Sequence, residues 1–157
     1  QEQEPLGTGG AFQLALENEE EEDILILNGD TFFKLNVLQF SAFHDSKEGE
    51  ISLALKPMEN FSRYGMVELA SDKSITVFRE KQFYATGYIN AGCYLLKPSS
   101  FLKYPWPQKF SFEKDYLENN SIAKKMYGYV EDAYFIDIGI PEDYYRAQTE
   151  LPKSFEK

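Results

Sequence analysis

The sequence contains one cysteine and one histidine, and it has no apolar run of bilayer-spanning length. Cys93 has no partner for an internal disulfide, so we interpret it as a small buried side chain of a protein in the reducing cytoplasm. The Cys and His ligands of a zinc site are missing, and we expect the lone His44 on the surface of a helix. The N-terminal residues QEQEPLG have neither the basic start nor the apolar core of a signal peptide.

Basic residues are also few, with 16 Lys and Arg against 26 Asp and Glu, which gives a formal net charge of -10. This balance argues against a nucleic-acid groove, because Lys and Arg hold phosphate backbones, and we expect no membrane partner either. An acidic enzyme can still bind small phosphorylated molecules when a divalent cation supplies positive charge. We therefore consider the carboxylates one by one as possible ligands of such a cation.

The order of apolar runs predicts one α/β domain over residues 1–157, with a strand-rich middle section. Residues 23–27, DILIL, are a continuous apolar run, typical of a strand buried on both faces in a parallel sheet. Thr8 is expected to cap a helix over 9–18, and Asn36, Ser111 and Pro141 each to open a later helix. Further strands are expected at 51–56, 65–70, 75–80, 88–96, 125–130 and 134–136.

Two aspartates follow apolar strands, which is where ligands collect in open α/β sheets. Asp30 comes after DILILNG, and Asp137 comes after AYFI and just before Gly139. Two oxygen ligands delivered by different strand ends suit Mg²⁺, which takes one or two carboxylates plus substrate phosphates. The alternative is that each aspartate only satisfies a turn.

Two other stretches also allow more than one interpretation. EPLGTGGAF, residues 4–12, has three glycines in four residues before a helical run, which suggests a phosphate cradle. FREK, residues 78–81, places Glu80 and Lys81 at a strand end. This pair is either a surface ion pair or a reader of a phosphorylated ligand, with Lys on the phosphate and Glu on hydroxyls.

Seven motifs in order resemble one family: EPLGTGGA, LNGDTFF, SRYGMVEL, FREK, GYINAGCYLL, FSFEKDYL and FIDIGIPEDYYRAQ. Together they resemble the sugar-1-phosphate nucleotidyltransferases, with spacing closest to the D-glycero-D-manno-heptose 1-phosphate and mannose-1-phosphate guanylyltransferases. The resemblance covers residues 4–151. It implies a Rossmann-like nucleotidyltransferase fold with a mixed, mostly parallel sheet and flanking helices. It also implies that NTP, GTP in particular, and a sugar 1-phosphate react to give NDP-sugar and pyrophosphate.

The resemblance also implies roles for the residues at the matching positions. Asp30 and Asp137 hold Mg²⁺ and, with Lys81 on the sugar phosphate, form the catalytic set. The implied substrate-binding residues are Glu80 on sugar hydroxyls, Gly65 and Asn90 in the sugar pocket, and Gly7 and Glu4 beside the nucleotide base. EPLGTGGA is thereby assigned to the base rather than to the phosphates.

The family's phosphate loop, GGxGTRL, and its later Pro-Lys pair match nothing in this sequence. The chain therefore resembles the C-terminal portion of such an enzyme, with the N-terminal portion missing. We expect at most trace transferase activity from it alone, and an unpaired apolar edge at DILIL that favours a homo-oligomer or completion by another chain. The alternatives are a non-catalytic remnant that binds sugar phosphate or aids assembly, and a purely structural domain.

Overall fold

The computed structural model describes residues 4–17, 22–79, 81–119 and 125–155. The strands are β1 (Ile24–Leu27), β2 (Thr31–Phe33), β3 (Ile51–Phe61), β4 (Met66–Leu69), β5 (Ile75–Arg79), β6 (Tyr84–Leu96), β7 (Met126–Val130) and β8 (Phe135–Asp137). The helices are α1 (Gly7–Leu16), α2 (Val37–Asp45), α3 (Pro98–Leu102), the π-helical turn η1 (Phe112–Leu117) and α4 (Pro141–Phe155). None of the described helices is both long and apolar enough to cross a bilayer.

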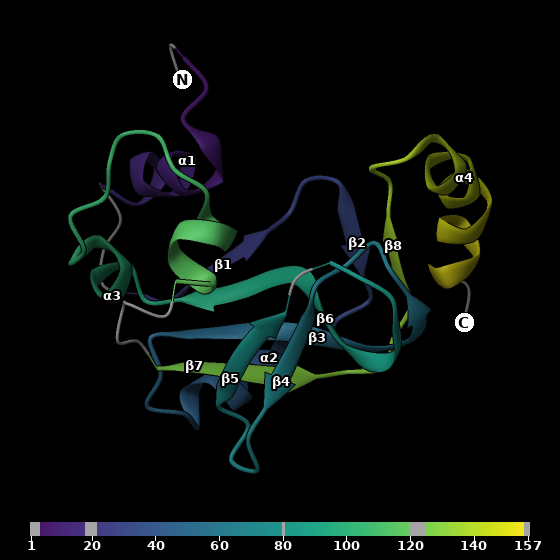
Figure 1. The fold of residues 1–157 in the computed structure, drawn as a ribbon, viewed down its shortest axis with the longest axis horizontal. Coiled ribbons are helices and arrows are strands. Elements are labelled where there is room, and N and C mark those ends of the chain that lie inside the picture. Colours follow the sequence, from purple (N-terminus) through teal and green to yellow (C-terminus); the bar gives the residue numbers. More distant parts are fainter. Residues whose placement is uncertain (1–3, 18–21, 80, 120–124, 156–157) are drawn as a thin grey trace.

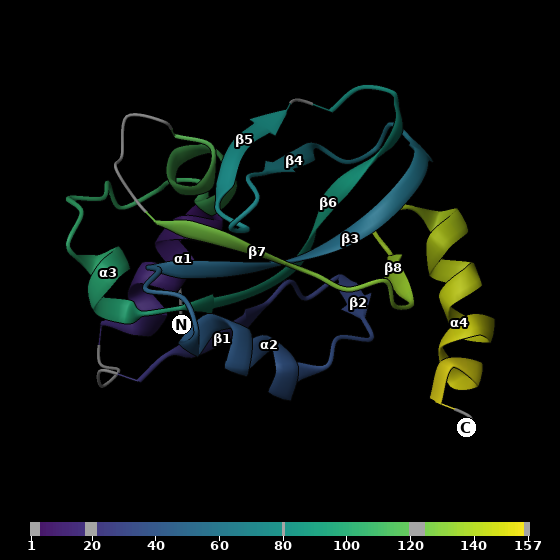
Figure 2. The same cartoon turned by 90° about the horizontal axis from the view of Figure 1, so that it is seen from below.

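A six-stranded sheet carries the fold, in the order β5-β4-β6-β3-β7, with β1 paired to the end of β6. A separate two-stranded sheet joins β2 to β8. Figure 1 shows α1, α3 and η1 gathered at one end of the molecule and α4 at the other. In Figure 2, α2 lies along one face of the large sheet. The α/β fold class is confirmed, and the space between the two ends is where the candidate site lies.

The expectation of a mostly parallel sheet is wrong. Among the described strand pairs only β3 and β7 run parallel, whereas β6 pairs antiparallel with β1, β3 and β4. The reason is that the middle section folds back on itself: β4 and β5 form a hairpin with a short turn, and β6 then returns between β4 and β3, antiparallel to both. The strand β1 is also less enclosed than DILIL suggested, because Leu27 is 58% exposed.

An aromatic cluster fixes the end of the molecule that carries α1, α3 and η1. The indole of Trp106 stacks on the ring of Phe110 with centroids 4.7 Å apart, and Phe112 meets Tyr94 of β6 edge-on at 5.2 Å. Phe101 lies among these rings and is fully buried. Aromatic pairs of this kind stabilise beyond their buried area. The segment that precedes η1 is therefore held against the large sheet.

The predicted helix caps at Asn36 and Ser111 are confirmed, and the one at Thr8 is wrong. Asn36 accepts a hydrogen bond from Gln39 N at 3.2 Å, and Ser111 accepts one from Lys114 N at 3.2 Å, as predicted. Thr8 does not cap α1, which begins one residue before it, at Gly7. The Thr8 hydroxyl is instead engaged by η1, since it donates to Glu113 and accepts from the backbone of that turn.

The expectation that His44 lies at the surface is also wrong. His44 is 5% exposed, and its Nδ1 is hydrogen-bonded to Ser52 Oγ of β3 at 2.7 Å. Its Nε2 lies 3.5 Å from the carboxylate of Asp23. The imidazole can be buried because both of its nitrogens have polar partners. Cys93, by contrast, is buried as predicted.

Candidate active site

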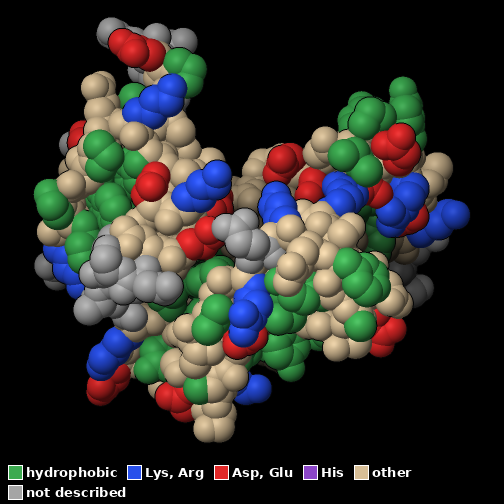
Figure 3. Space-filling model, viewed as in Figure 1, with side chains coloured by type: hydrophobic (Ala, Val, Ile, Leu, Met, Phe, Trp, Pro, Cys, Tyr) green, Lys and Arg blue, Asp and Glu red, His purple; other side chains and the backbone are tan. Residues whose placement is uncertain are grey.

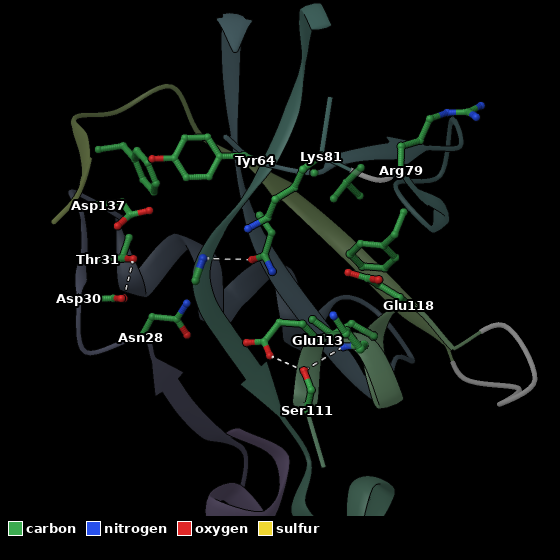
Figure 4. Close-up of a pocket in the computed structure, with 18 residues that line it drawn as sticks. Asn28, Asp30, Thr31, Tyr64, Arg79, Lys81, Ser111, Glu113, Glu118 and Asp137 are labelled. Carbon is green, nitrogen blue, oxygen red and sulfur yellow. Dashed lines mark hydrogen bonds between the residues drawn. The ribbon is translucent and has the colours of Figure 1, made fainter. Parts of the chain in front are cut away.

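A cleft of about 400 Å³ opens between the end formed by β2 and β8 and the end formed by η1. Five of the sequence-predicted residues line it, namely Asp30, Gly65, Lys81, Asn90 and Asp137. Figure 4 shows Asp30, Lys81 and Asp137 around the cleft, each from a different segment of the chain. In Figure 3 the surface is hollowed between the same two ends, and acidic and basic side chains gather beside the hollow. The cleft is therefore polar and carries charges of both signs.

The two aspartates are brought together by the β2–β8 ladder. Thr31, the residue after Asp30, stands opposite Asp137 in this antiparallel pair. The backbone N–H of Ile138 donates to the carbonyl of Asp30 at 2.9 Å, which fixes the register. The sequence placed both aspartates at strand ends of one parallel sheet. The structure unites them instead through a short antiparallel sheet that the sequence did not predict.

The oxygen atoms of both carboxylates are suited to a divalent cation. Asp137 Oδ1 accepts a hydrogen bond from Gly139 N at 2.8 Å, and no hydrogen bond within the described residues reaches its Oδ2 at that range. Asp30 Oδ1 accepts a hydrogen bond from Thr31 Oγ1 at 3.3 Å. No third Asp, Glu, His or Cys joins them into a larger ligand group within the described residues. Two carboxylates fit Mg²⁺, which fills its other positions with water and phosphate oxygens.

An arginine clamp, formed by Arg63 and Arg146 on the carboxylate of Asp143, lies beside Asp137. Asp143, on the first turn of α4, is 7% exposed and accepts hydrogen bonds from Arg63 and from Arg146, the latter at 2.5 Å. Arg63 in turn brings its Nη2 to 3.7 Å from Asp137 Oδ2. The hydrogen bond to Asp143 is the main cause that raises the pKa of Arg63, so this guanidinium stays charged. Positive charge is thus fixed beside one candidate metal ligand.

Tyr64 lines the cleft next to this clamp. Burial, followed by the negative charge of Asp137, raises the pKa of its phenol to about 12. The hydroxyl therefore remains protonated at neutral pH and acts as a neutral hydrogen-bonding group. The sequence did not single out Tyr64 or Arg63, although both lie in the motif SRYGMVEL.

The charged residues Arg79 and Lys81 of FREK both line the cleft, but within the described residues only Arg79 of the two is paired with a carboxylate of the sheet. Arg79 Nε donates to Glu68 Oε1 at 2.6 Å across the β4–β5 pair. Lys81 is exposed and lines the cleft, where its ammonium is available to an anion. Glu80 lies outside the described residues, so its assignment to sugar hydroxyls stays a prediction.

Gly65 and Asn90 shape the cleft by close packing and by hydrogen bonds. A Cβ at Gly65 would lie 2.7 Å from the carbonyl oxygen of Arg79, so the backbones approach too closely for any other residue. Asn90 Nδ2 donates to the Tyr94 hydroxyl at 2.9 Å, and its Oδ1 accepts from Gly92 N at 3.0 Å. Both residues therefore have defined positions on the cleft wall.

The wall formed by η1 was missed as a site. Ser111, Glu113 and Lys114 all line the cleft, whereas the sequence gave Ser111 only a capping role. Their motif, FSFEKDYL, stood among the seven that carry the resemblance, which was the available signal. The π-helical form of this turn is a second signal visible only in the structure, since π-helical turns are frequent at functional sites.

Glu4 and Gly7 are not among the residues that line the cleft. Gly7 has a φ of +73°, and a Cβ there would lie 2.5 Å from the carbonyl oxygen of Phe110. The glycine-rich stretch thus packs against the segment before η1, and Gly9 N donates to the same carbonyl at 3.0 Å. The assignment of Gly7 and Glu4 to a nucleotide base stays a prediction.

Residues 1–154 match the nucleotidyl transferase family model, and the chain belongs to this family. It is 47% identical over 150 residues to D-glycero-alpha-D-manno-heptose 1-phosphate guanylyltransferase of Aneurinibacillus thermoaerophilus, covering 96% of this chain and 65% of the relative. The enzyme of the same name from Campylobacter jejuni is 43% identical, covering 92% and 62%. The family predicted from the order of the motifs is confirmed.

Solved structures agree with this assignment. The crystal structure of HddC from Yersinia pseudotuberculosis matches with a TM-score of 0.83 and 37% identity, covering 96% of this chain and 64% of that one. The same protein has also been solved in complex with GMP-PN. The inositol-1-phosphate CTP transferase of T. maritima, at 16% identity and a TM-score of 0.74, shares the fold. The chain spans less than two thirds of the length of these relatives.

Proposed function

We propose that this protein provides the metal and sugar-phosphate part of a sugar-1-phosphate guanylyltransferase site. The observation that carries the proposal is that the β2–β8 ladder sets Asp30 and Asp137 side by side in the cleft that Lys81 also lines. The heptose 1-phosphate guanylyltransferases at 47% and 43% identity support GTP and a heptose- or mannose-type 1-phosphate as substrates. The fold of a relative solved with GMP-PN supports the nucleotide.

The proposed reaction is a single in-line phosphoryl displacement. An oxygen of the sugar phosphate forms a bond to the α-phosphorus of GTP as the bond from that phosphorus to the β-phosphate oxygen breaks. The electron pair of the broken bond leaves with pyrophosphate, and the product is a GDP-sugar. No side chain has to act as a nucleophile, so the protein contributes by positioning the reactants and by placing charge.

Each site residue has a role in this scheme. Asp30 and Asp137 hold Mg²⁺, which neutralises phosphate charge when it is bound. Lys81 binds the sugar phosphate, and the tight backbone at Gly65 together with Asn90 shapes the sugar pocket. Glu80 is assigned to sugar hydroxyls, and Gly7 with Glu4 to the guanine base. The buried thiol of Cys93 is consistent with the reducing cytoplasm, where we place the protein.

We further propose that full activity belongs to a longer polypeptide or an assembly. The relatives extend beyond the part matched by this chain, and GGxGTRL and the Pro-Lys pair match nothing in its sequence. Within the described residues, β1 pairs only with β6, which leaves its other edge unpaired, and its Leu27 is exposed. Such an edge pairs readily with a further strand, from a second copy or from another chain.

Calorimetry on the purified chain tests the proposal. Mannose 1-phosphate and heptose 1-phosphate are titrated with and without Mg²⁺, and GTP is titrated under the same two conditions. We expect sugar 1-phosphate binding together with GTP binding that depends on Mg²⁺. Binding of sugar 1-phosphate without any metal-dependent nucleotide binding would favour the non-catalytic remnant. Absence of both would overturn the proposal.

A coupled assay for pyrophosphate, run with GTP, Mg²⁺ and each sugar 1-phosphate, tests the proposal about length. We expect at most trace turnover from the 157-residue chain, because the sequence lacks the basic groups of the phosphate loop. Robust turnover would show that the chain needs no such loop.

A further inference from the structure

A hydrogen-bond cluster joins the glycine-rich stretch to the cleft wall. Glu113 Oε2 accepts a hydrogen bond from Thr8 Oγ1 at 2.8 Å and a second from Ser111 Oγ at 3.1 Å. Thr8 Oγ1 also accepts from the backbone N–H of Phe112 at 2.9 Å. Thr8 and Glu113 stand 105 residues apart in the sequence, so this contact is a tertiary link rather than a helix cap.

The second oxygen of the same carboxylate faces the cleft. Within the described part of the chain, no hydrogen bond or ion pair reaches Glu113 Oε1, and Figure 4 shows this oxygen turned toward the open space. An ionised carboxylate is an acceptor only and takes donors on both oxygens. One oxygen is thus fixed by the protein, and the other is presented to whatever fills the cleft.

We propose that Glu113 is a substrate-binding residue that accepts a hydrogen bond from a hydroxyl of the sugar, and that Thr8 is the residue that positions it. This inference rests on the proposed function. The sugar end of the substrate offers O–H donors, whereas the phosphate end is repelled by a carboxylate. The phosphate therefore lies toward Lys81 and the aspartate pair, and the hydroxyl face lies toward η1. Glu113 thereby sets the direction of the sugar across the cleft.

Backbone contacts make the positioning rigid. Gly9 N donates to the Phe110 carbonyl at 3.0 Å, and Phe110 N donates to the Leu6 carbonyl at 3.1 Å. These bonds enclose Thr8, so the start of α1 and the segment before η1 form one unit. The stretch assigned to the guanine base is consequently tied to the residue assigned to the sugar.

Calorimetry with mannose 1-phosphate and its monodeoxy analogues tests the hydroxyl contact in the protein. Glu113→Gln keeps the shape of the side chain but removes its charge. In the variant the amide oxygen keeps the donors Thr8 and Ser111, so the NH2 group, a donor, replaces the acceptor that faces the cleft. We expect this change to weaken the binding of mannose 1-phosphate about tenfold, as for the loss of one hydrogen bond to a charged group, and to leave GTP affinity within twofold. Wild type should bind one monodeoxy analogue about tenfold more weakly than mannose 1-phosphate. The Glu113→Gln variant should bind that analogue and mannose 1-phosphate with similar affinity. Glu142→Gln, on the exposed first turn of α4, is the matched control and should bind as wild type.

The positioning role of Thr8 is tested separately. Thr8→Val keeps the size of the side chain but removes the hydroxyl, and it should weaken the binding of mannose 1-phosphate about fivefold. Thr8→Ser, which keeps the hydroxyl, should bind mannose 1-phosphate as wild type does. Combining Thr8→Val with Glu113→Gln should cost no more than Glu113→Gln alone, because both changes act through one contact. Thr149→Val, on the surface of α4, is the control. A purely structural role predicts instead that Thr8→Val lowers the thermal midpoint and weakens GTP equally.

The two proposals fail in different ways. If wild type binds mannose 1-phosphate and Glu113→Gln binds it and every deoxy analogue with unchanged affinity, the role of Glu113 is refuted and the proposed function stands. If Thr8→Val alone binds as wild type, the positioning role is refuted. If wild type binds neither sugar 1-phosphate nor GTP with Mg²⁺, both the proposed function and this inference are wrong.

Discussion

Replacing Gly9 by Ala should destabilise the protein, although alanine is the better helix former. An added Cβ at Gly9 would lie 2.2 Å from Cε2 of the Phe110 ring. That ring is 5% exposed and stacks on Trp106 at 4.7 Å, so it has little room to move. Overpacking of a close-packed core costs about 1–3 kcal/mol. A contact of 2.2 Å puts this cost in the upper half of that range, about 2–3 kcal/mol, and the gain in helix propensity is about 1 kcal/mol, so the net loss is on the order of 1–2 kcal/mol.

Urea unfolding followed by the fluorescence of Trp106 measures this loss, and the thermal midpoint should fall by roughly 3–6 °C. Gly29→Ala is the matched control, because a Cβ at that position meets nothing within 4 Å. Its free energy of unfolding should stay within about 0.5 kcal/mol of wild type. If Gly9→Ala is as stable as Gly29→Ala, the tight packing of the glycine-rich stretch on Phe110 is refuted.

Three further predictions concern buried or partly buried polar groups. Asp143→Asn should cost about 2 kcal/mol of unfolding free energy, below the value for a fully buried pair because both arginine partners are partly exposed; urea unfolding that matches wild type would contradict it. Burial raises the pKa of the Cys93 thiol to about 11, so the native protein should react with a disulfide reagent at pH 8 only as fast as it unfolds. The pKa of Tyr64 is raised to about 12, so the unfolded chain loses this proton near pH 10 while the folded chain keeps it. The contribution of Tyr64 to stability is therefore complete below pH 10 and lost as the pH rises toward 12, which Tyr64→Phe should reveal as a flatter stability profile.

The sequence predicted the features that depend on local chemistry. Asn36 and Ser111 cap their helices because their side chains reach backbone N–H groups three residues ahead, which a short window of sequence reveals. Pro141 opens α4 for a similarly local reason. The order of the motifs then identified the family, and it placed Asp30 and Asp137 in one site before any contact was known.

The features that were missed depend on residues far apart in the chain. The strand β2 has three residues, too few to show a period of two, and it forms only because β8 pairs with it. Thr8 would cap a helix on local rules, but its oxygen accepts a hydrogen bond from Phe112 N instead, and its proton goes to Glu113, 105 residues away. The burial of His44 depends on Ser52 and Asp23, which lie on other elements and satisfy both ring nitrogens.

The central claim is that Asp30 and Asp137 form one metal site, and direct measurement of metal affinity tests it most simply. Mn²⁺ binding in the presence of GTP is followed by electron paramagnetic resonance for wild type, Asp30→Asn, Asp137→Asn and the control Asp45→Asn, which changes an exposed carboxylate at the end of α2. We predict one Mn²⁺ per chain, an affinity at least about tenfold weaker in each of the first two variants, and no change in the control. Wild-type affinity in either Asp30→Asn or Asp137→Asn would contradict the account.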